Sequence, residues 1–311
     1  MINREKNFAS AVIYVHNAEK QIKDFLKTII AVLEENFDHS EIICVNDSSE
    51  DRSLDVIKET ANIATRTSVS VLNMSYFHGL EPAMNAGSDL AIGDFVFEFD
   101  NACLDFDSAE IMKVYRRSLQ GYDIVAAVPD KKERTSSRFF YQIFGRFSER
   151  AVEMRTERFR ILSRRVINRV SSMNKTIPYR KAIYATSGLK TDKVVYQPTN
   201  ISFAKNAQEN KYRLGLAVDS LLLFTEIGYK ASIGMTVLMM LISVFMLVYS
   251  IAVFITANPV TGWTTTILFL SVAFLGLFVI LTVIIKYLQL ILNLVFKRKQ
   301  YSFESIEKLT K

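Results

Sequence analysis

The chain has 311 residues, of which 23% are charged, and its net charge of +6 is modest for its length. This size allows one α/β domain of roughly 200 to 230 residues and a further segment. Cys44 and Cys103 are the two cysteines, and neither has histidine neighbours at metal-ligand spacing. The composition therefore excludes a disulfide-stapled framework, and we expect two reduced cysteines in the core of a cytosolic domain.

The first 130 residues alternate between short apolar runs and longer segments with apolar residues at helical spacing. The apolar runs predict strands at residues 11–15, 41–45, 69–74, 94–100 and 122–129, and the periodic segments predict helices at residues 20–36, 53–64, 81–91 and 108–119. Strands that alternate with helices are typical of a doubly wound, mostly parallel sheet. The sequence therefore predicts an α/β fold.

Two carboxylates follow predicted strands of this sheet. Asp47 comes after the second strand, and Asp100 ends the fourth. In parallel sheets of this type ligands bind beyond the carboxyl ends of the strands, so both residues are candidates for a ligand site. Each also has a plainer interpretation. Asp47 could cap the helix that begins near Ser53, and Asp100 could merely end a strand.

Residues 131–181 form a strongly basic stretch. They hold 15 lysines and arginines against 4 glutamates and no aspartate, and aromatic residues such as Phe139 and Phe144 interleave with arginines such as Arg138 and Arg146. This pattern is typical of a segment that lies on an anionic membrane surface. Nucleic-acid binding is the competing interpretation of a basic aromatic patch, and the apolar stretch that follows makes it the weaker one.

No Asp, Glu, Lys or Arg occurs in the 55 positions of residues 231–285. A helix needs about 20 apolar residues to cross a membrane. This stretch therefore predicts two transmembrane helices, at residues 231–256 and about 263–287, joined by a turn at residues 258–262. A buried helical hairpin in a soluble core is the alternative, but the segments show no polar face at helical spacing.

Basic residues flank the predicted hairpin on one side of the membrane. Lys230 precedes the first helix, and Lys286 and residues 297–299 follow the second, whereas the connecting turn has no basic residue. By the positive-inside rule both flanks are cytosolic. We therefore expect a multi-pass protein of the plasma (inner) membrane with a cytosolic N-terminal domain and no signal peptide.

A series of motifs in the same order carries a resemblance to a known family, from about residue 10 to the second predicted membrane helix. These motifs are residues 14–19, 45–49, 77–87, 159–164, 178–180, 188–190 and 205–212. The chain resembles the family 2 glycosyltransferases of the inverting type, in particular the polyprenyl-phosphate sugar synthases. That group includes dolichyl-phosphate mannose synthase and the bacterial enzymes that make undecaprenyl-phosphate glucose.

The resemblance implies a GT-A-like fold and an activity in cell-envelope synthesis. The activity is inverting transfer of a sugar from a nucleotide-sugar donor to polyprenyl (undecaprenyl) phosphate at the cytosolic membrane face. The implied nucleotide-binding residues are Tyr14, His16, Asn17, Glu19, Asp47 and Gly79. His16 is equally compatible with a plain turn residue.

The predicted acceptor is anionic, so its site needs cations more than it needs a base. Arg160, Lys205 and Lys211 are the candidates for binding the acceptor phosphate, and Asp100, Arg160 and Lys211 are the candidate catalytic residues. Each of the three cations is equally compatible with a solvated surface charge.

Members of this family hold a divalent metal on an Asp-x-Asp motif at the end of the fourth strand. In this chain Asp100 is kept, but Ala102 stands in place of the second carboxylate. Because Mg²⁺ can bind through one or two carboxylates plus phosphate and water, we expect Mg²⁺ or Mn²⁺ on Asp100, alone or with help from Asn101, Asp105 or Asp107. A decayed metal site is the alternative. Asn46 also replaces an acidic residue of the family, and Ser48 replaces a glycine.

We expect four regions along the chain. Residues 1–130 form the nucleotide-sugar-binding half, residues 131–230 the basic acceptor-side and juxtamembrane segment, residues 231–290 the two transmembrane helices, and residues 291–311 a cytosolic tail. The end of this tail, from residue 300, is polar and is expected to be loosely ordered or a short helix.

Two other functions remain open on the sequence alone. The chain could act on another lipid-linked or cell-surface glycan, or it could be a non-catalytic membrane scaffold that binds nucleotide sugar. Two membrane helices per chain also suggest a shared bundle in a homo-oligomer.

Overall fold

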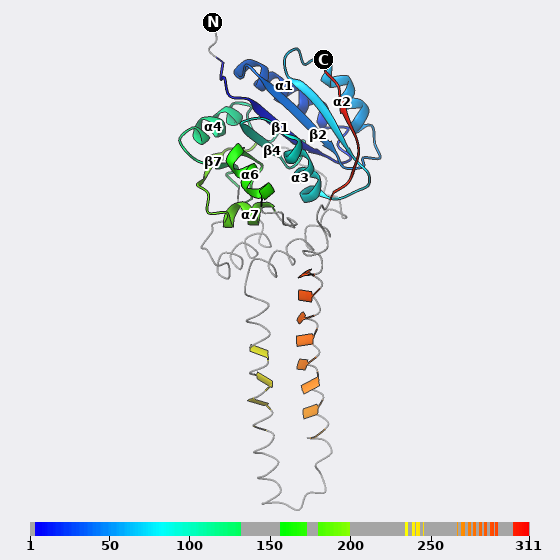
Figure 1. The fold of residues 1–311 in the computed structure, drawn as a ribbon, viewed down its shortest axis with the longest axis vertical. Coiled ribbons are helices and arrows are strands. Elements are labelled where there is room, and N and C mark those ends of the chain that lie inside the picture. The colour runs from blue at the N-terminus through cyan, green and yellow to red at the C-terminus, as the bar shows by residue number, and fades with distance from the viewer. Residues whose placement is uncertain are drawn as a thin grey trace, which may run out of the picture.

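The computed structural model describes residues 4–131, 156–172, 180–199 and 301–310, together with single helical positions between residues 234 and 291. The described chain forms a sheet domain, with the helical positions extending away from it in two columns (Figure 1). Both described chain ends belong to the sheet domain.

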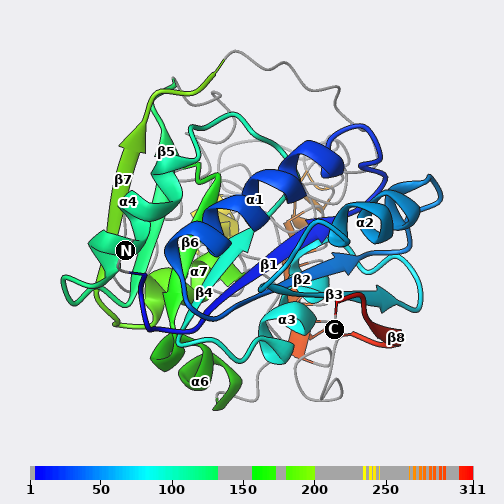
Figure 2. The ribbon, with the colours of Figure 1, turned by 90° about the horizontal axis from the view of Figure 1, so that it is seen from above.

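One sheet of eight strands organises the domain, in the order β7-β5-β6-β4-β1-β2-β3-β8. The strands are β1 (Ala9–Val15), β2 (Ser40–Asn46), β3 (Ser68–Met74), β4 (Phe95–Phe99), β5 (Ile124–Pro129), β6 (Phe159–Ser163), β7 (Thr191–Tyr196) and β8 (Phe303–Lys308). Figure 2 shows them from β7 on the left to β8 on the right. The helices are α1 (Ile22–Asn36), α2 (Ser53–Ala61), α3 (Leu80–Leu90), α4 (Ala109–Ser118), α6 (Arg164–Ser172) and α7 (Arg180–Thr186).

The strand directions confirm the predicted α/β fold and refine it. Strands β1 to β4 pair in parallel, as do β5 and β7, whereas the pairs β4–β6, β5–β6 and β3–β8 are antiparallel. Every strand and helix expected up to residue 129 is present, with ends that differ by at most three residues. The sheet is therefore mostly parallel, as predicted, with β6 and β8 as its antiparallel strands.

Apolar side chains bury both faces of the sheet. Ala11 and Ile13 of β1 point into a cluster with α1, α2 and α4, whereas Val12 points into a second cluster with α3, α6 and α7. This alternation is the period-two pattern of a strand that is covered on both sides. Gly87 lets α3 approach closely, since a Cβ there would lie 2.5 Å from Val12 and 2.6 Å from Val45.

Strand β6 comes from the segment that the sequence marked as basic and membrane-facing. It lies between β4 and β5, and it is buried from Phe159 to Leu162. Strand β7, which follows the basic stretch but belongs to the expected acceptor-side region of residues 131–230, is an edge strand of the sheet. Residues expected on the acceptor side thus complete the same sheet as the first 130 residues.

The prediction that the chain end is loosely ordered or a short helix is wrong. Residues 303–308 form β8, which pairs antiparallel with β3. An isolated segment with three charged residues in six has little strand signal of its own. The free hydrogen-bonding edge of β3 supplies the partner, and that partner is more than 200 residues away in the sequence.

In the described part of the chain, no helix has both the length and the apolar character required to cross a membrane. The predicted spans, residues 231–256 and 263–287, lie mostly outside the described residues. The described positions of the two columns do touch each other. A Cβ on Gly276 would lie 2.4 Å from the Cε atom of Met239.

Ser48 follows β2 in the left-handed region of the backbone, with φ of 52°. This conformation costs a non-glycine residue about 1 kcal/mol or more. We expect Ser48→Gly to raise the free energy of unfolding by about 0.5 to 1 kcal/mol, after the larger unfolded-state entropy of glycine is subtracted. The shift in thermal midpoint would be roughly 1 to 4 °C.

A matched control for Ser48 is Ser108, whose φ of −53° suits any residue. Ser108→Gly should lower the thermal midpoint because glycine there only adds unfolded-state entropy. Equal destabilisation by the two substitutions would show that the backbone at Ser48 is not strained.

Candidate functional site

Asp47 lies directly after β2 and is fully buried. Its carboxylate accepts hydrogen bonds from the hydroxyl of Tyr14 at 2.9 Å and from the backbone N–H groups of His78 and Gly79, each at 2.8 Å. The side chain is therefore held by β1 and by the loop between β3 and α3. It does not cap α2, because Asp51 accepts the hydrogen bonds of Ser53.

Gly79 begins α3 with φ of 85° and ψ of 170°, a conformation that a side chain would strain. This geometry turns its N–H group toward Asp47. His16 contacts the same residue from the other side, since its Nδ1 atom lies 2.8 Å from the carbonyl oxygen of Asp47. The structure thus brings together four of the six predicted nucleotide-binding residues, namely Tyr14, His16, Asp47 and Gly79.

The other two predicted nucleotide-binding residues, Asn17 and Glu19, hold the loop that follows β2. The amide oxygen of Asn17 accepts from the N–H of Glu50 at 2.8 Å, and Glu19 accepts from the N–H of Arg52 at 3.2 Å. These bonds join the loop after β1 to the loop after β2. The contacts of Asn17 and Glu19 give both side chains a role in shaping the loops around Asp47.

Burial raises the pKa of Asp47, and its hydrogen bonds from His78, Tyr14 and Gly79 only partly oppose that effect. A carboxylate in this setting binds hydrogen-bond donors strongly, because a buried charge gains most from each donor that it finds.

Aromatic rings surround this carboxylate. His16 packs on Phe77 with ring centroids 4.6 Å apart, and Tyr76 stacks on His78 at 4.0 Å. Tyr76 is 60% exposed and Phe77 is 36% exposed, so both rings offer apolar surface to a ligand. Planar heterocycles stack on such rings. The sequence analysis did not single out Tyr76 or Phe77, because one or two aromatic residues in a loop carry no pattern.

Asp100 lies directly after β4. Like Asp47, it is therefore at the carboxyl ends of the parallel strands. Strands β2 and β4 flank β1 in parallel, so the two ends lie roughly 10 Å apart. Two arginines hold the Asp100 carboxylate: Arg180 at 2.8 Å from Oδ1 and Arg160 at 2.8 Å from Oδ2.

These arginines belong to a buried cluster of charges. Arg160 and Arg180 have side chains that are 4% and 1% exposed. Glu98 lies between them, with Oε2 at 3.3 Å from Arg160 and 2.8 Å from Arg180. Glu81 of α3 accepts from both the backbone N–H and Nε of Arg180, at 2.9 Å. Ser88 and Tyr184 donate to the other oxygen of Glu98.

Sheet register explains how two of these charges meet. Glu98 of β4 and Arg160 of β6 are direct partners in the antiparallel pair. The charged residue in the run Phe95–Phe99 is therefore balanced by the charged residue opposite it. Glu157 and Lys181 extend the cluster outward, with Glu157 at 3.1 Å from Arg160 and 3.5 Å from Lys181.

The electrostatic setting of Asp100 is opposite to that of Asp47. Burial alone would raise the pKa of Asp100, but the charges of Arg160 and Arg180 outweigh it and hold the pKa below its usual value. The same contacts raise the pKa of both arginines despite their burial. Both guanidinium groups therefore stay charged under all conditions in which the protein is folded.

The predicted metal ligands are occupied by cationic or hydrogen-bonding side chains. Both oxygens of Asp100 contact arginines, and Asp105 pairs with Arg158 and accepts from Tyr196 at 3.1 Å. Among the described residues, no group of three or more His, Cys, Asp or Glu side chains could hold a metal ion. As they stand, Asp100 and Asp105 do not form a metal site.

Lys205 and Lys211 lie outside the described residues. Arg160 is described, and it is a buried partner of carboxylates rather than a solvated charge. Arg180 was missed as a site residue, although it follows the predicted strands in a motif that resembles the family. The signal that could have identified it is Glu98, since a glutamate inside an apolar strand requires a buried cation.

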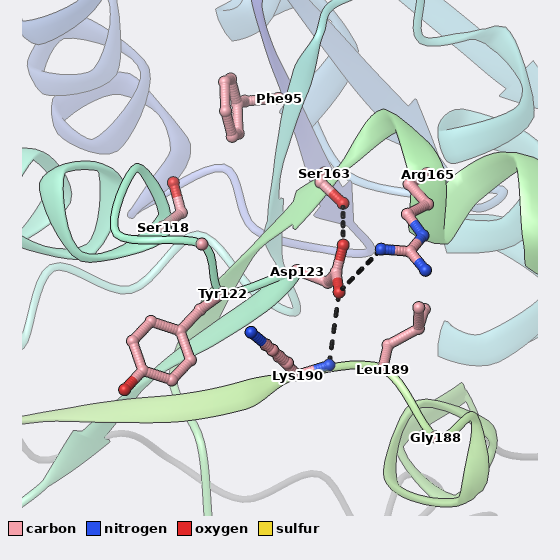
Figure 3. A pocket seen from close by; sticks show the side chains of 10 residues that line it. Phe95, Ser118, Tyr122, Asp123, Ser163, Arg165, Gly188, Leu189 and Lys190 are labelled. Atoms are coloured by element: carbon pink, nitrogen blue, oxygen red, sulfur yellow. Dashed lines mark hydrogen bonds and ion pairs between the residues drawn. The ribbon is translucent and has the colours of Figure 1, made fainter.

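A surface pocket lies at the opposite end of the parallel strands, where β5 and β7 begin (Figure 3). Its centre is Asp123, which accepts from Ser163 at 3.2 Å and from the N–H of Lys190 at 3.3 Å, with Arg165 at 3.8 Å. Asp123 and Lys190 precede β5 and β7, whereas Asp47 and Asp100 follow their strands. This pocket is therefore remote from the residues described above.

Removing Arg180 would leave Glu81 and Glu98 buried without their cation. We expect Arg180→Ala to lower the free energy of unfolding by about 3 to 5 kcal/mol. Arg165→Ala is the matched control, because Arg165 is 72% exposed and lies 3.8 Å from Asp123, where an ion pair contributes about 1 kcal/mol or less. Denaturant unfolding of both variants checks this, and similar losses would mean that the cluster contributes no more than a surface pair.

The lowered pKa of Asp100 predicts a pH dependence of stability. Its ion pairs contribute fully above the ordinary aspartate pKa of 3.8, and their contribution is lost as the pH falls through the lower pKa of the folded state. We expect Asp100→Asn to make the fall in thermal midpoint below about pH 4 shallower than in the unsubstituted chain. Thermal unfolding at a series of pH values measures this, and parallel curves would contradict it.

Comparison with known proteins agrees with this arrangement. Residues 10–176 match the family described as Glycosyl transferase family 2. The chain is 25% identical over 271 residues to the uncharacterized glycosyltransferase YkcC of Bacillus subtilis, covering 83% of this chain and 81% of that protein. It is 27% identical over 282 residues to the bactoprenol glucosyl transferase of Shigella phage SfX, covering 86% of this chain and 88% of that protein.

A solved structure shares the fold. It is glucosyl-3-phosphoglycerate synthase from Mycobacterium tuberculosis in complex with Mn²⁺ and UDP-glucose, with a TM-score of 0.50, 12% identity, and coverage of 70% of this chain and 77% of that one. A family match over more than half of the chain, together with glycosyltransferase relatives that cover most of its length, identifies the protein. The chain is a glycosyltransferase of family 2 with a GT-A-like sheet, and it resembles the polyprenyl-phosphate sugar transferases of that family.

Proposed function

We propose that this glycosyltransferase moves a sugar, with inversion, from a nucleotide-sugar donor to a polyprenyl phosphate such as undecaprenyl phosphate. The observation that carries the proposal is the pairing of two unlike sites on one edge of the sheet. A buried carboxylate with aromatic neighbours lies at the end of β2, and two buried arginines lie at the end of β4. The name of the phage relative, a bactoprenol glucosyl transferase, supports the lipid acceptor.

The nucleotide of the donor fits the Asp47 side of this edge. A base can stack on the exposed rings of Tyr76 and Phe77. Asp47 is fully buried and binds the N–H groups of His78 and Gly79, so it would position the loop that carries these rings. His16 and Gly79 line the same place. UDP-glucose in the solved structure with the same fold is consistent with a nucleotide sugar here.

The phosphate groups fit the arginine side. The side chain of Asp100 is 20% exposed, so it is the part of the arginine contacts that faces outward. A phosphate that replaced this carboxylate would meet Arg160 and Arg180 together, and guanidinium groups bind phosphate by paired hydrogen bonds. Lys205 and Lys211 stay predicted partners of the acceptor phosphate.

The arginines would act by holding charge in place. An acceptor phosphate oxygen is already anionic at neutral pH, so the reaction needs alignment with the anomeric carbon and little proton removal. The leaving diphosphate gains negative charge as the bond breaks, and fixed cations nearby stabilise it. Arg160 and Arg180 are positioned by Glu81 and Glu98 before any substrate arrives.

A divalent cation remains an expectation of the proposal, and the solved structure with the same fold holds Mn²⁺. Asp100 and Asp105 could take part only after Arg158, Arg160 and Arg180 had moved to other anions. Transfer with and without Mg²⁺ or Mn²⁺ measures whether the reaction requires a divalent cation.

The proposed location is the cytosolic face of the plasma membrane, anchored by residues 231–290 and with residues 291–311 on the cytosolic side. Residues 231–285 have no charged side chain, and large apolar side chains at described positions are exposed, including Leu241 at 62%, Phe245 at 68% and Leu277 at 57%. A polyprenyl acceptor would reach the arginines from such a surface.

Another lipid-linked or cell-surface glycan as acceptor is the alternative enzyme function, and a homo-oligomer remains a prediction. A non-catalytic scaffold is disfavoured because the chain belongs to a glycosyltransferase family and matches the phage glucosyl transferase over most of both chains.

A transfer assay tests the proposal. Membranes containing the chain are incubated with undecaprenyl phosphate and radiolabelled UDP-glucose or GDP-mannose, with Mg²⁺, Mn²⁺ or a chelator, and label in the organic phase is counted. We expect label in lipid, and we expect Arg160→Lys, which keeps the positive charge but loses the paired guanidinium hydrogen bonds to phosphate, to reduce it about 100-fold. Asp123→Asn, at the opposite edge of the sheet, is the control and should transfer at the unsubstituted rate.

Label that enters polymer or saccharide instead of the lipid phosphate would favour the alternative acceptor. Nucleotide binding without any product under every cation condition would contradict transfer by this chain.

A further inference from the structure

The strand at the end of the chain, β8, reaches the donor side of the site. We propose that β8 is a positioning element for nucleotide binding, which holds the two loops that surround Asp47. This inference rests on the proposed function, because it assumes that the Asp47 side binds the donor. Figure 1 shows β8, in red, along the edge of the sheet beside β3.

Backbone bonds set β8 against the last five residues of β3. The register runs from Ser70 opposite Lys308 to Met74 opposite Phe303, with an irregularity between Asn73 and Met74. Beyond the ladder, the N–H of Ser75 donates to the carbonyl of Ser302 at 3.2 Å. The strand therefore follows β3 to its carboxyl end, where the loop that carries Tyr76, Phe77, His78 and Gly79 begins.

The first link to Asp47 passes through His78. The N–H of Ser302 lies 3.1 Å from Nε2 of His78, while Nδ1 of the same ring lies 2.5 Å from the carbonyl oxygen of Tyr76. These two partners fix one neutral tautomer, in which Nδ1 donates and Nε2 accepts. The side chain of His78 is 2% exposed, and its backbone N–H donates to Asp47.

The second link passes through two asparagines. Nδ2 of Asn73 donates to Ser305 at 3.1 Å and to Glu307 at 3.0 Å, and its Oδ1 accepts from Asn46 at 3.0 Å. Asn46 directly precedes Asp47, and its own oxygen accepts from the N–H of Ser49 at 3.2 Å. Hydrogen bonds therefore run without a break from β8 to the residue before Asp47.

This second link explains why an asparagine stands where the family has an acidic residue. Asn46 has to donate to Asn73 and accept from Ser49 at once. An aspartate could accept but not donate, so it would leave the oxygen of Asn73 without this partner. Asn46 is therefore matched to Asn73 and, through it, to β8.

Further contacts hold β8 itself in place. The hydroxyl of Tyr301 donates to Asp89 of α3 at 2.5 Å, and Ser171 of α6 donates to the other oxygen of Asp89 at 3.1 Å. Lys58 of α2 pairs with Glu307 at 2.6 Å, although both side chains are about 40% exposed and this pair contributes little. Side-chain contacts therefore hold Tyr301, just before β8, and Ser305 and Glu307 within it.

A single substitution can remove the hydrogen bond from the N–H of Ser302 to His78. Ser302→Pro deletes the N–H group that binds His78 and keeps the carbonyl that accepts from Ser75, whereas Ser302→Ala keeps both. In the full-length chain, purified in detergent, we measure the dissociation constants of UDP, GDP, CDP and ADP and follow the one that binds most tightly. We expect Ser302→Pro to weaken that binding about tenfold and Ser302→Ala to leave it unchanged.

A double substitution tests the second link without a proline. Ser305→Ala with Glu307→Ala removes both acceptors of Asn73, and Glu304→Ala is the control on a neighbouring exposed position of β8. We expect the double variant to weaken nucleotide binding severalfold, with an unchanged KM for undecaprenyl phosphate. A merely structural role would lower the thermal midpoint and affect both substrates alike.

The outcomes separate this inference from the proposed function. If the unsubstituted chain binds none of the four nucleotides, or if Asp47→Asn binds as well as the unsubstituted chain, the donor assignment fails and the inference fails with it. If Asp47→Asn loses binding but Ser302→Pro and the double variant both bind normally, the donor site stands and β8 is not a positioning element.

Discussion

The contacts of Arg180 with three carboxylates impose the strictest constraint on this structure. The guanidinium group is buried at the start of α7 and binds Glu81 of α3, Glu98 of β4 and Asp100 beyond it. A buried charge is tolerated only when every partner is present, so these positions constrain one another. Because Arg160 enters the same cluster from β6, the cluster also determines how β6 fits between β4 and β5.

Asp47 and Asp100 lie in opposite electrostatic surroundings. Burial raises the pKa of Asp47, whose carboxylate binds the N–H groups of His78 and Gly79, whereas the arginines lower the pKa of Asp100 and keep positive charge in place. A nucleotide sugar has both kinds of group, a polar base with ribose and an anionic diphosphate. The arrangement of unlike sites some 10 Å apart along the edge matches that division, and it underlies the proposed chemistry.

The departures from the family pattern make physical sense when they are taken with their partners. Asn46 donates to Asn73, which in turn binds β8, and Ser48 occupies a left-handed backbone position that glycine would adopt without strain. Ala102 is buried beside a carboxylate, Asp100, that two arginines already satisfy.

The sequence by itself determined the elements up to residue 129, because the hydrophobic period of strands and helices is a local signal. It also proposed Asp47, Asp100 and Arg160 as site residues. Only the tertiary structure decided what these residues touch. The strand β6 inside a basic stretch, the role of Arg180 and the pairing of β8 with β3 all depend on contacts between distant segments. A charged or polar residue has no periodic signature, and its burial becomes favourable only when a partner elsewhere in the chain is brought within hydrogen-bond distance.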